Sequence, residues 1–232
     1  MTVTTIPSKA PPSALYNIAH RGARSLAPEN TMAAIEKAWQ IGAHGVEVDV
    51  SVSVDGELIL FHDDLLTRTT DVDEKFPDRV DQPITTFTLE ELRSLDAGTW
   101  FIEADPLGEV SEGNVSLSEQ SAMQGIQIPL LEEVLFFVKT KDWFINLELK
   151  ALPPPHNNFP VVEHVLQLLE RVQMPSTNLA ISSFKFNYLS KIQSLNSDLE
   201  INALIGVPYS GKQDWGDYEF KIYNANSAYT DE

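Results

Sequence analysis

The sequence predicts an α/β fold of the (β/α)8 barrel type. Short apolar runs alternate with amphipathic segments along most of the 232 residues, and polar side chains capable of chemistry follow or line at least four successive runs. Alternating strands and helices are typical of parallel sheets, which are either open and doubly wound or closed into a barrel. We favour the barrel because its functional groups gather on one rim from several strands, whereas an open sheet concentrates them at a switch point.

The first elements are predicted to form a strand, a helix and a second strand. An apolar run at residues 15–19 indicates a strand that ends in His20. A Pro-Glu-Asn-Thr segment then precedes a helix, which Asn30 or Thr31 can cap and which closes at Gly42.

The second strand is predicted over residues 45–54, where valine occupies every second position from 46 to 54. Glu47 and Asp49 occupy alternate positions, so both carboxylates point away from the valines and towards the same side. Buried carboxylates need a positive partner, and Mg²⁺ or Ca²⁺ prefers such oxygen ligands. The alternative is an ordinary solvated face of the strand.

A third strand, at residues 58–61, ends in His62, and we expect Asp63 and Asp64 to shape the turn that follows. Residues 65–127 are polar, and a capping box at residues 88–91 is their clear helix signal. This stretch is too long for a plain loop, so we interpret it as an insertion after the third strand that partly folds and overhangs the site.

The later elements continue the alternation of helices and strands. The strand at residues 144–150 places Asn146, Glu148 and Lys150 on the face opposite its apolar residues. The other segments are a helix at 129–138, a helix at 162–172, a strand at 179–184, a helix at 188–195 and a strand at 201–207. The tail at 209–232 is polar and shows no further strand signal, which leaves open whether the barrel is complete at its C-terminus.

The net charge and the cysteine content limit which partners and which cellular compartment are expected for this chain. A net charge of −18 argues against nonspecific binding to nucleic acid or anionic lipid. The absence of cysteine excludes disulfides and thiolate chemistry and agrees with a reducing compartment, so a cytoplasmic location is expected. Residues 1–14 are predicted to be a flexible arm without a signal peptide, and residues 15–232 a single domain without a transmembrane segment. The pattern does not indicate an oligomeric state.

The candidate functional residues form a set suited to phosphoryl transfer. They comprise three carboxylates for a hard divalent cation, two cations for phosphate oxygens and two histidines for proton transfer: Glu47, Asp49, Glu148, Arg21, Lys150, His20 and His62. One histidine would activate the nucleophile while the other protonates the leaving alkoxide. The other three histidines are interpreted as surface or structural groups, and Glu29 as a charge at a helix N-terminus.

The ordered motifs over roughly residues 16–190 resemble those of the glycerophosphodiester phosphodiesterase family. They are His20-Arg21-Gly22, residues 28–31, Glu47 with Asp49, His62-Asp63, residues 96–101, residues 129–135 and Glu148 with Lys150. The resemblance implies a TIM-type barrel that hydrolyses glycerophosphodiesters to glycerol 3-phosphate and an alcohol with one Mg²⁺ or Ca²⁺, in glycerol and lipid metabolism. The family's closing Trp-Thr-Val-Asn-like signature is missing from residues 209–232.

Carrying the family roles over residue by residue assigns each candidate. Glu47, Asp49 and Glu148 would bind the metal, and His20 and His62 would be the acid/base pair. The substrate-binding residues would be Arg21, Lys150 and Phe184, the last as a pocket wall or else a core aromatic. Two alternatives stay open: a lysophospholipase D-like enzyme acting on a lipid diester, and a non-enzymatic barrel that serves in binding.

Overall fold

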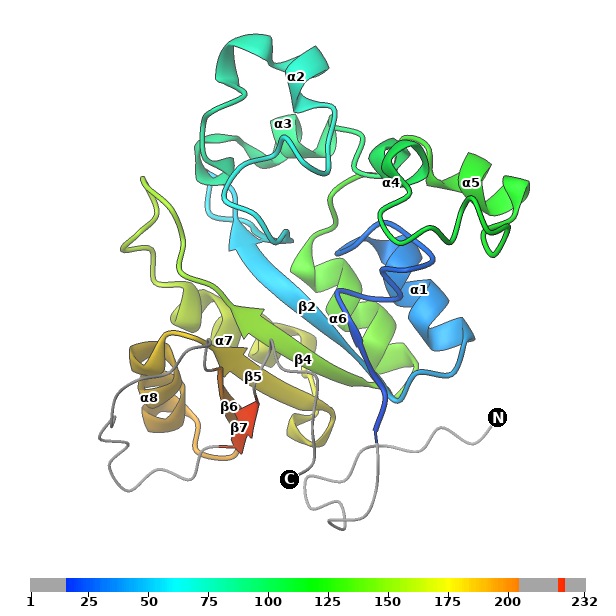
Figure 1. The fold of residues 1–232 in the computed structure, drawn as a ribbon. Coiled ribbons are helices and arrows are strands. Elements are labelled where there is room, and N and C mark those ends of the chain that lie inside the picture. The colour runs from blue at the N-terminus through cyan, green and yellow to red at the C-terminus, as the bar shows by residue number, and fades with distance from the viewer. Residues whose placement is uncertain (1–15, 205–220, 224–232) are drawn as a thin grey trace.

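The computed structural model describes residues 16–204 and 221–223, which form one seven-stranded sheet flanked by helices (Figure 1). Six strands are parallel, in the order β1-β2-β4-β5-β6-β7. Their bounds are β1 Ile18–His20, β2 Gly45–Val52, β4 Phe144–Leu149, β5 Leu179–Ser183, β6 Glu200–Leu204 and β7 Lys221–Tyr223. The crossovers carry α1 (Met32–Gln40), α6 (Leu131–Thr140), α7 (Val161–Val172) and α8 (Phe186–Leu195), which confirms the predicted α/β class.

The main core lies between the sheet and these helices. The valines of β2 at 46, 48, 50 and 52 are fully buried and pack in one cluster with apolar residues of all four helices. Because side chains alternate along a strand, the polar residues of β2 and β4 point to the other side of the sheet. The apolar period thus places Glu47, Asp49 and Glu148 on the inner side of the sheet.

The third strand differs from the expectation of a run of parallel strands. β3 (Leu58–Leu60) pairs antiparallel with β2, with Val50 opposite Leu60, and lies off the path of the parallel strands. A turn at Asp55-Gly56 is long enough for a hairpin, whereas a parallel partner requires a crossover of a dozen or more residues. β3 therefore extends the β2 hairpin and brings His62 back over the sheet.

Residues 65–127 fold into short helices above the C-terminal ends of the strands (Figure 1). They contain α2 (Val72–Lys75), α3 (Leu89–Arg93), α4 (Thr99–Ala104) and α5 (Leu117–Met123), and the 3₁₀ turns η1 (Pro77–Arg79) and η2 (Ile84–Thr86). One small core surrounds Phe87 and a second joins Phe101 to Ala34 of α1. The boundaries of the insertion stay a prediction.

Near the C-terminus the sequence pattern missed one element. β7 continues the parallel sheet beside β6, although the polar tail showed no strand signal. A strand of three residues is too short for an alternating pattern to be recognised. The predicted arm at 1–14, the end of the predicted strand at 205–207 and the remainder of the tail lie outside the described residues. Within the described ranges no helix has the length and apolar character needed to cross a membrane.

Candidate active site

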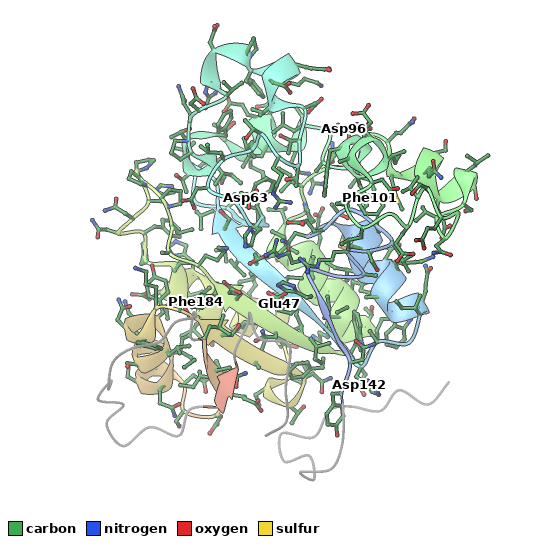
Figure 2. The ribbon with its side chains drawn as sticks, in the orientation of Figure 1. Glu47, Asp63, Asp96, Phe101, Asp142 and Phe184 are labelled. Atoms are coloured by element: carbon green, nitrogen blue, oxygen red, sulfur yellow. The ribbon has the colours of Figure 1, made fainter. Side chains whose placement is uncertain are left out.

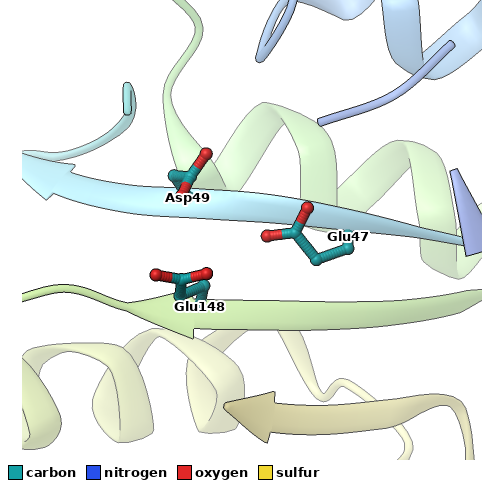
Figure 3. Close-up of side chains that lie close together, drawn as sticks. All are labelled: Glu47, Asp49 and Glu148. Atoms are coloured by element: carbon teal, nitrogen blue, oxygen red, sulfur yellow. The ribbon is translucent and has the colours of Figure 1, made fainter. Parts of the chain in front are cut away.

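The register of the parallel strands brings the predicted carboxylates together. His20 of β1 pairs in register with Glu47 of β2, and Asp49 pairs with Glu148 of β4. Neighbouring strands lie about 4.8 Å apart, so side chains of paired residues on one face are adjacent. One oxygen each of Glu47, Asp49 and Glu148 lies within 4.8 Å of the others (Figure 3).

This carboxylate cluster fits a hard divalent cation. Glu47 is 8% exposed and Asp49 1%, and the Oε1 atom of Glu47 and the Oδ1 atom of Asp49 accept no hydrogen bond from the described residues. Burial, with the nearby Asp49 charge, raises the pKa of Glu47 well above its ordinary value, and the same two causes raise the pKa of Glu148. The buried carboxylates repel each other, and two of their oxygens lack a hydrogen-bond donor among the described residues. A bound Mg²⁺ or Ca²⁺ would stabilise the ionised carboxylates by coordinating these oxygens.

Asp49 is held in place by a residue that the sequence offered only as a helix cap. Thr31 caps α1 by accepting from the backbone N–H of Ala34. Asn30 instead takes a left-handed conformation, with a φ of 54°, and donates its Nδ2 to Asp49 Oδ2 at 2.8 Å. Its Oδ1 accepts from the Asp49 backbone N–H at 3.1 Å, so the two residues form a closed pair of hydrogen bonds.

The two predicted cations border the same cluster. Arg21 Nε lies 3.3 Å from Asp49 Oδ2, and Lys150 Nζ lies 3.8 Å from Asp49 Oδ1. The backbone N–H of Arg21 also donates to Glu47 Oε2 at 3.0 Å. Two cations beside three carboxylates compensate part of the negative charge and leave room for a divalent ion.

The predicted histidines have different surroundings. His20 Nε2 lies 3.7 Å from Glu47 Oε2, and burial, followed by the positive charge of Arg21, lowers the pKa of His20 to about 4. His62 shares a 2.5 Å hydrogen bond between its Nδ1 and Asp63 Oδ1. Although burial opposes it, hydrogen bonding to His62 and Arg68 holds the pKa of Asp63 well below its usual range.

A cleft of about 380 Å³ opens at the candidate site. It is lined by His20, Arg21, His62, Glu148, Leu149, Lys150, Ala151, Phe184 and Lys185. Phe184 is 45% exposed at its wall, so this aromatic is not a core residue. Asp63 lies near the C-terminal end of β2, whereas Asp142 lies at the opposite end of the sheet (Figure 2). Six of the eight predicted site residues therefore line one cleft, and the other two, Glu47 and Asp49, adjoin it through their cluster with Glu148.

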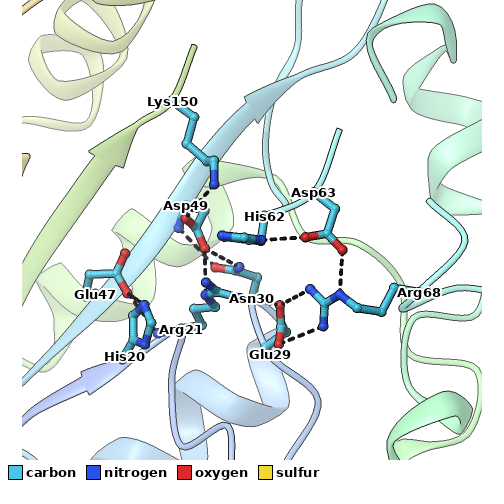
Figure 4. A network of polar contacts seen from close by, with 10 residues as sticks. All are labelled: His20, Arg21, Glu29, Asn30, Glu47, Asp49, His62, Asp63, Arg68 and Lys150. Atoms are coloured by element: carbon cyan, nitrogen blue, oxygen red, sulfur yellow. Dashed lines mark hydrogen bonds and ion pairs between the residues drawn. The ribbon is translucent and has the colours of Figure 1, made fainter. Parts of the chain in front are cut away.

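Sequence reasoning missed the roles of four polar residues in the contacts of this site. The sequence predicts Asn30 as a cap residue, Asp63 as a turn residue and Glu29 as a charge at a helix N-terminus. Glu29 in fact accepts hydrogen bonds from Arg21 and from Arg68, a residue that no motif singled out (Figure 4). The motifs at residues 28–31 and at His62-Asp63 were the signals that could have indicated contacts of Glu29, Asn30 and Asp63.

The other histidines contact backbone groups elsewhere. His44 Nδ1 accepts from the Asn17 backbone N–H, and His156 Nε2 lies 3.0 Å from the Ser53 carbonyl. His164 Nδ1 lies 3.0 Å from the Pro160 carbonyl at the start of α7. These contacts agree with the structural interpretation of all three.

Comparison with known proteins gives a consistent family. A sequence model described as the glycerophosphoryl diester phosphodiesterase family matches residues 20–229. The glycerophosphoinositol inositolphosphodiesterase of Mus musculus is 37% identical over 164 residues, which are 71% of this chain and 30% of that protein. The glycerophosphodiester phosphodiesterase of Caldanaerobacter subterraneus is 32% identical over 187 residues, which are 81% of this chain and 65% of that protein. The chain thus spans less than two thirds of the length of each.

Solved structures agree with the sequence comparison. A phosphodiesterase of Oleispira antarctica, determined in complex with the product sn-glycerol-3-phosphate, has a TM-score of 0.64 at 30% identity. The likeness covers 85% of this chain and 68% of that one, and it confirms the predicted TIM-type barrel class. Because the family model matches most of its length and its relatives agree, the chain belongs to the glycerophosphoryl diester phosphodiesterase family.

Proposed function

We propose that this chain hydrolyses glycerophosphodiesters to glycerol 3-phosphate and an alcohol, with one divalent cation, Mg²⁺ or Ca²⁺. The observation that carries the proposal is that two histidines, two cations and the carboxylate of Glu148 line a single cleft, and that Glu47 and Asp49 lie within 4.8 Å of Glu148 in one buried cluster. Glu47, Asp49 and Glu148 would hold the cation, which when bound supplies Lewis-acid polarisation of a phosphoryl oxygen. The sn-glycerol-3-phosphate found in the Oleispira antarctica enzyme supports the same product here.

The cationic side chains would bind the phosphate. Arg21 and Lys150 both line the cleft, and the Lys150 side chain is 23% exposed. Charged donors make short, strong hydrogen bonds to phosphate oxygens and fix the orientation of the diester. Phe184, at the exposed wall, would pack against the organic part of the substrate.

The histidines would move the protons. Both His20 and His62 line the cleft, so an in-line attack with one ring on each side of the phosphorus is compatible with their placement. One ring would accept the proton of the attacking water and the other would donate a proton to the leaving alkoxide. The assignment of acid and base to the two rings stays open.

The test is release of glycerol 3-phosphate from glycerophosphocholine and glycerophosphoethanolamine, measured with Mg²⁺, with Ca²⁺ and with EDTA. We expect release with at least one cation and none with EDTA. Release only from lysophosphatidylcholine would establish the lipid diesterase instead. A folded chain that binds the cation and cleaves none of these diesters would contradict the proposal.

We also propose a cytoplasmic enzyme of glycerol and lipid metabolism that acts on a small molecule. The lack of cysteine supports the cytoplasmic location. The acidic charge, which disfavours nucleic acid and anionic lipid, supports a small-molecule substrate. Fractionation of cells that produce the natural protein tests the location, and recovery in the membrane fraction would contradict it.

A further inference from the structure

Arg68 lies at the junction between the site and the segment 65–127, and each nitrogen of its half-exposed guanidinium donates a hydrogen bond. Its Nε donates to Asp63 Oδ2 at 2.5 Å, and its Nη1 and Nη2 donate to the two oxygens of Glu29 at 3.2 and 2.7 Å (Figure 4). The guanidinium carbon also lies 5.9 Å from the ring centroid of Trp100 on α4. A planar fork that engages two carboxylates and an aromatic ring has few alternative orientations.

These contacts connect the two halves of the candidate site. Asp63 reaches His62 through the 2.5 Å hydrogen bond to Nδ1. Glu29 Oε1 accepts from Arg21 Nη1 at 2.9 Å, and Arg21 Nε lies 3.3 Å from Asp49 Oδ2. A chain of residues with alternating charge thus connects the proposed metal ligand Asp49, through Arg21, Glu29, Arg68 and Asp63, to the ring of His62.

Without Arg68 nothing described would hold Asp63 against His62. The Asp63 side chain is 26% exposed, and among the described residues it has hydrogen bonds with His62 and Arg68. A partly exposed carboxylate that loses its cation can rotate towards water. When a carboxylate accepts from Nδ1–H, it selects one tautomer and leaves Nε2 free for proton transfer.

We propose that Arg68 is a positioning residue of this site. Its guanidinium fixes Asp63, and through Asp63 the ring orientation and Nδ1–H tautomer of His62, relative to the metal ligands. The contact with Trp100 connects this alignment to the packing of α4. The proposal rests on the proposed function for its kinetic consequence, but its structural consequence can be measured without turnover.

The variants are Arg68→Ala and Arg68→Lys, with Arg79→Ala as a matched control. Arg79 also lies within 65–127, donates to the carboxylate of Glu91 at 2.6 Å and lies over the Phe87 ring at 3.8 Å. Like Arg68 it lines no part of the cleft, but its partner Glu91 bonds with Thr88 and with no candidate site residue. Lysine retains the charge but cannot bridge two carboxylates with a planar fork, so Arg68→Lys should restore only part of the activity.

The kinetic test compares kcat and KM for a glycerophosphodiester in the presence of the activating cation. We expect Arg68→Ala to lower kcat by about 10- to 100-fold, as mutation of outer-shell partners does, with KM changed by less than about twofold. Arg79→Ala should keep the kcat of the unmodified chain. An unchanged kcat in Arg68→Ala, or equal losses in both alanine variants, would overturn the proposal.

The structural test is ¹⁵N NMR of the histidine rings in the full chain, with the His62 signals identified by their loss in His62→Ala. We expect the Nδ1–H tautomer in the unmodified chain and in Arg79→Ala, and a mixture with the Nε2–H tautomer in Arg68→Ala. A His62 signal that does not change in Arg68→Ala would overturn the positioning role even if kcat falls. If the unmodified chain cleaves no diester, the proposed function fails, and the tautomer comparison alone decides the role of Arg68.

Discussion

Asp49 shows why the buried carboxylates lower the stability of the chain and yet can bind a cation. It is 1% exposed, accepts one hydrogen bond from Asn30, and has Arg21 and Lys150 within ion-pair distance. Burial of several carboxylates is unfavourable unless positive charge compensates it, so the protein surrounds them with donors and cations. The oxygens left without a donor, on Glu47 and Asp49, are those available to a cation.

Glu47→Gln tests this electrostatic interpretation through two effects of opposite sign. The neutral amide removes one anionic ligand, so Mg²⁺ or Ca²⁺ affinity should fall by about tenfold or more. Because burial and Asp49 raise the Glu47 pKa, removal of the charge should raise the unfolding temperature of the cation-free chain. Calorimetric titration and thermal unfolding measure the two, with Glu132→Gln of α6, whose half-buried carboxylate pairs with the exposed Arg171, as control. Equal cation affinity in both variants would exclude Glu47 from the site.

His20→Ala and His62→Ala should each remove proton transfer without unfolding the chain. General acid–base groups contribute about 10²- to 10⁴-fold, so kcat should fall by at least about 100-fold. Both residues follow or end short strands and contribute little to the core, so circular dichroism and the unfolding midpoint should change little. His164→Ala is the control. Unfolded variants would instead assign these histidines to a structural role.

The connection between β1 and α1 is the element that positions the most site residues. It closes on itself through Asn30 N–H donating to the Arg21 carbonyl at 3.0 Å, and it packs on α1 through Ala23 N–H donating to Ala34 O at 2.9 Å. At Gly22, where φ is 82°, an added Cβ would lie 2.6 Å from the Ala34 Cβ. Only a glycine permits this close approach, which holds Arg21 over the carboxylates.

Gly22→Ala should therefore lower the free energy of unfolding by more than the positive φ angle alone would. Gly42 has a similar φ of 84°, but an added Cβ there would meet nothing within 4 Å, so Gly42→Ala isolates the cost of positive φ. We expect about 1 kcal/mol for Gly42→Ala and about 1–3 kcal/mol more for Gly22→Ala, where overpacking adds to it. Urea unfolding of both variants gives the difference. Equal free energies of unfolding would show that the loop relaxes freely.

For the whole molecule, carboxyl groups whose pKa is lowered by folding contribute a stability that is lost in acid. Hydrogen bonds stabilise the ionised forms of several carboxylates, and those from Thr99 hold the pKa of Asp96 below its ordinary value although burial opposes this. A carboxyl group whose pKa is lower in the folded chain contributes stability above its unfolded pKa, about 3.9 for aspartate, and that stability is lost as pH falls through the folded pKa. Asp63 and Glu29 have the same sign of shift.

The free energy of unfolding should therefore decrease as pH falls below about 4 to 5. Asp96 lies outside the cleft, so Asp96→Asn should reduce this decrease and leave the cleft groups in place. Urea unfolding of both chains at neutral and acidic pH is the measurement. An identical pH dependence in the two chains would contradict a contribution from Asp96.

Local patterns were sufficient for much of the fold and for a set of candidate site residues that the structure brings together. The alternating valines of β2 predicted a strand with Glu47 and Asp49 on its other face, and the same period grouped Glu148 with Lys150. Strand period and helix caps depend on residues a few positions apart, so they can be recognised in the sequence. Family membership followed from the order of such motifs along the chain.

Contacts between distant segments depended on the tertiary structure. The register that sets Asp49 beside Glu148, the antiparallel return of β3, and the conversion of Asn30 and Glu29 from helix-start residues into partners of Asp49 and Arg68 had no local signal. Each joins segments that are 19 or more residues apart, except within the β2–β3 hairpin. Such pairings are selected by the packing of the whole sheet and by the need to compensate buried charge, which no short stretch of sequence contains.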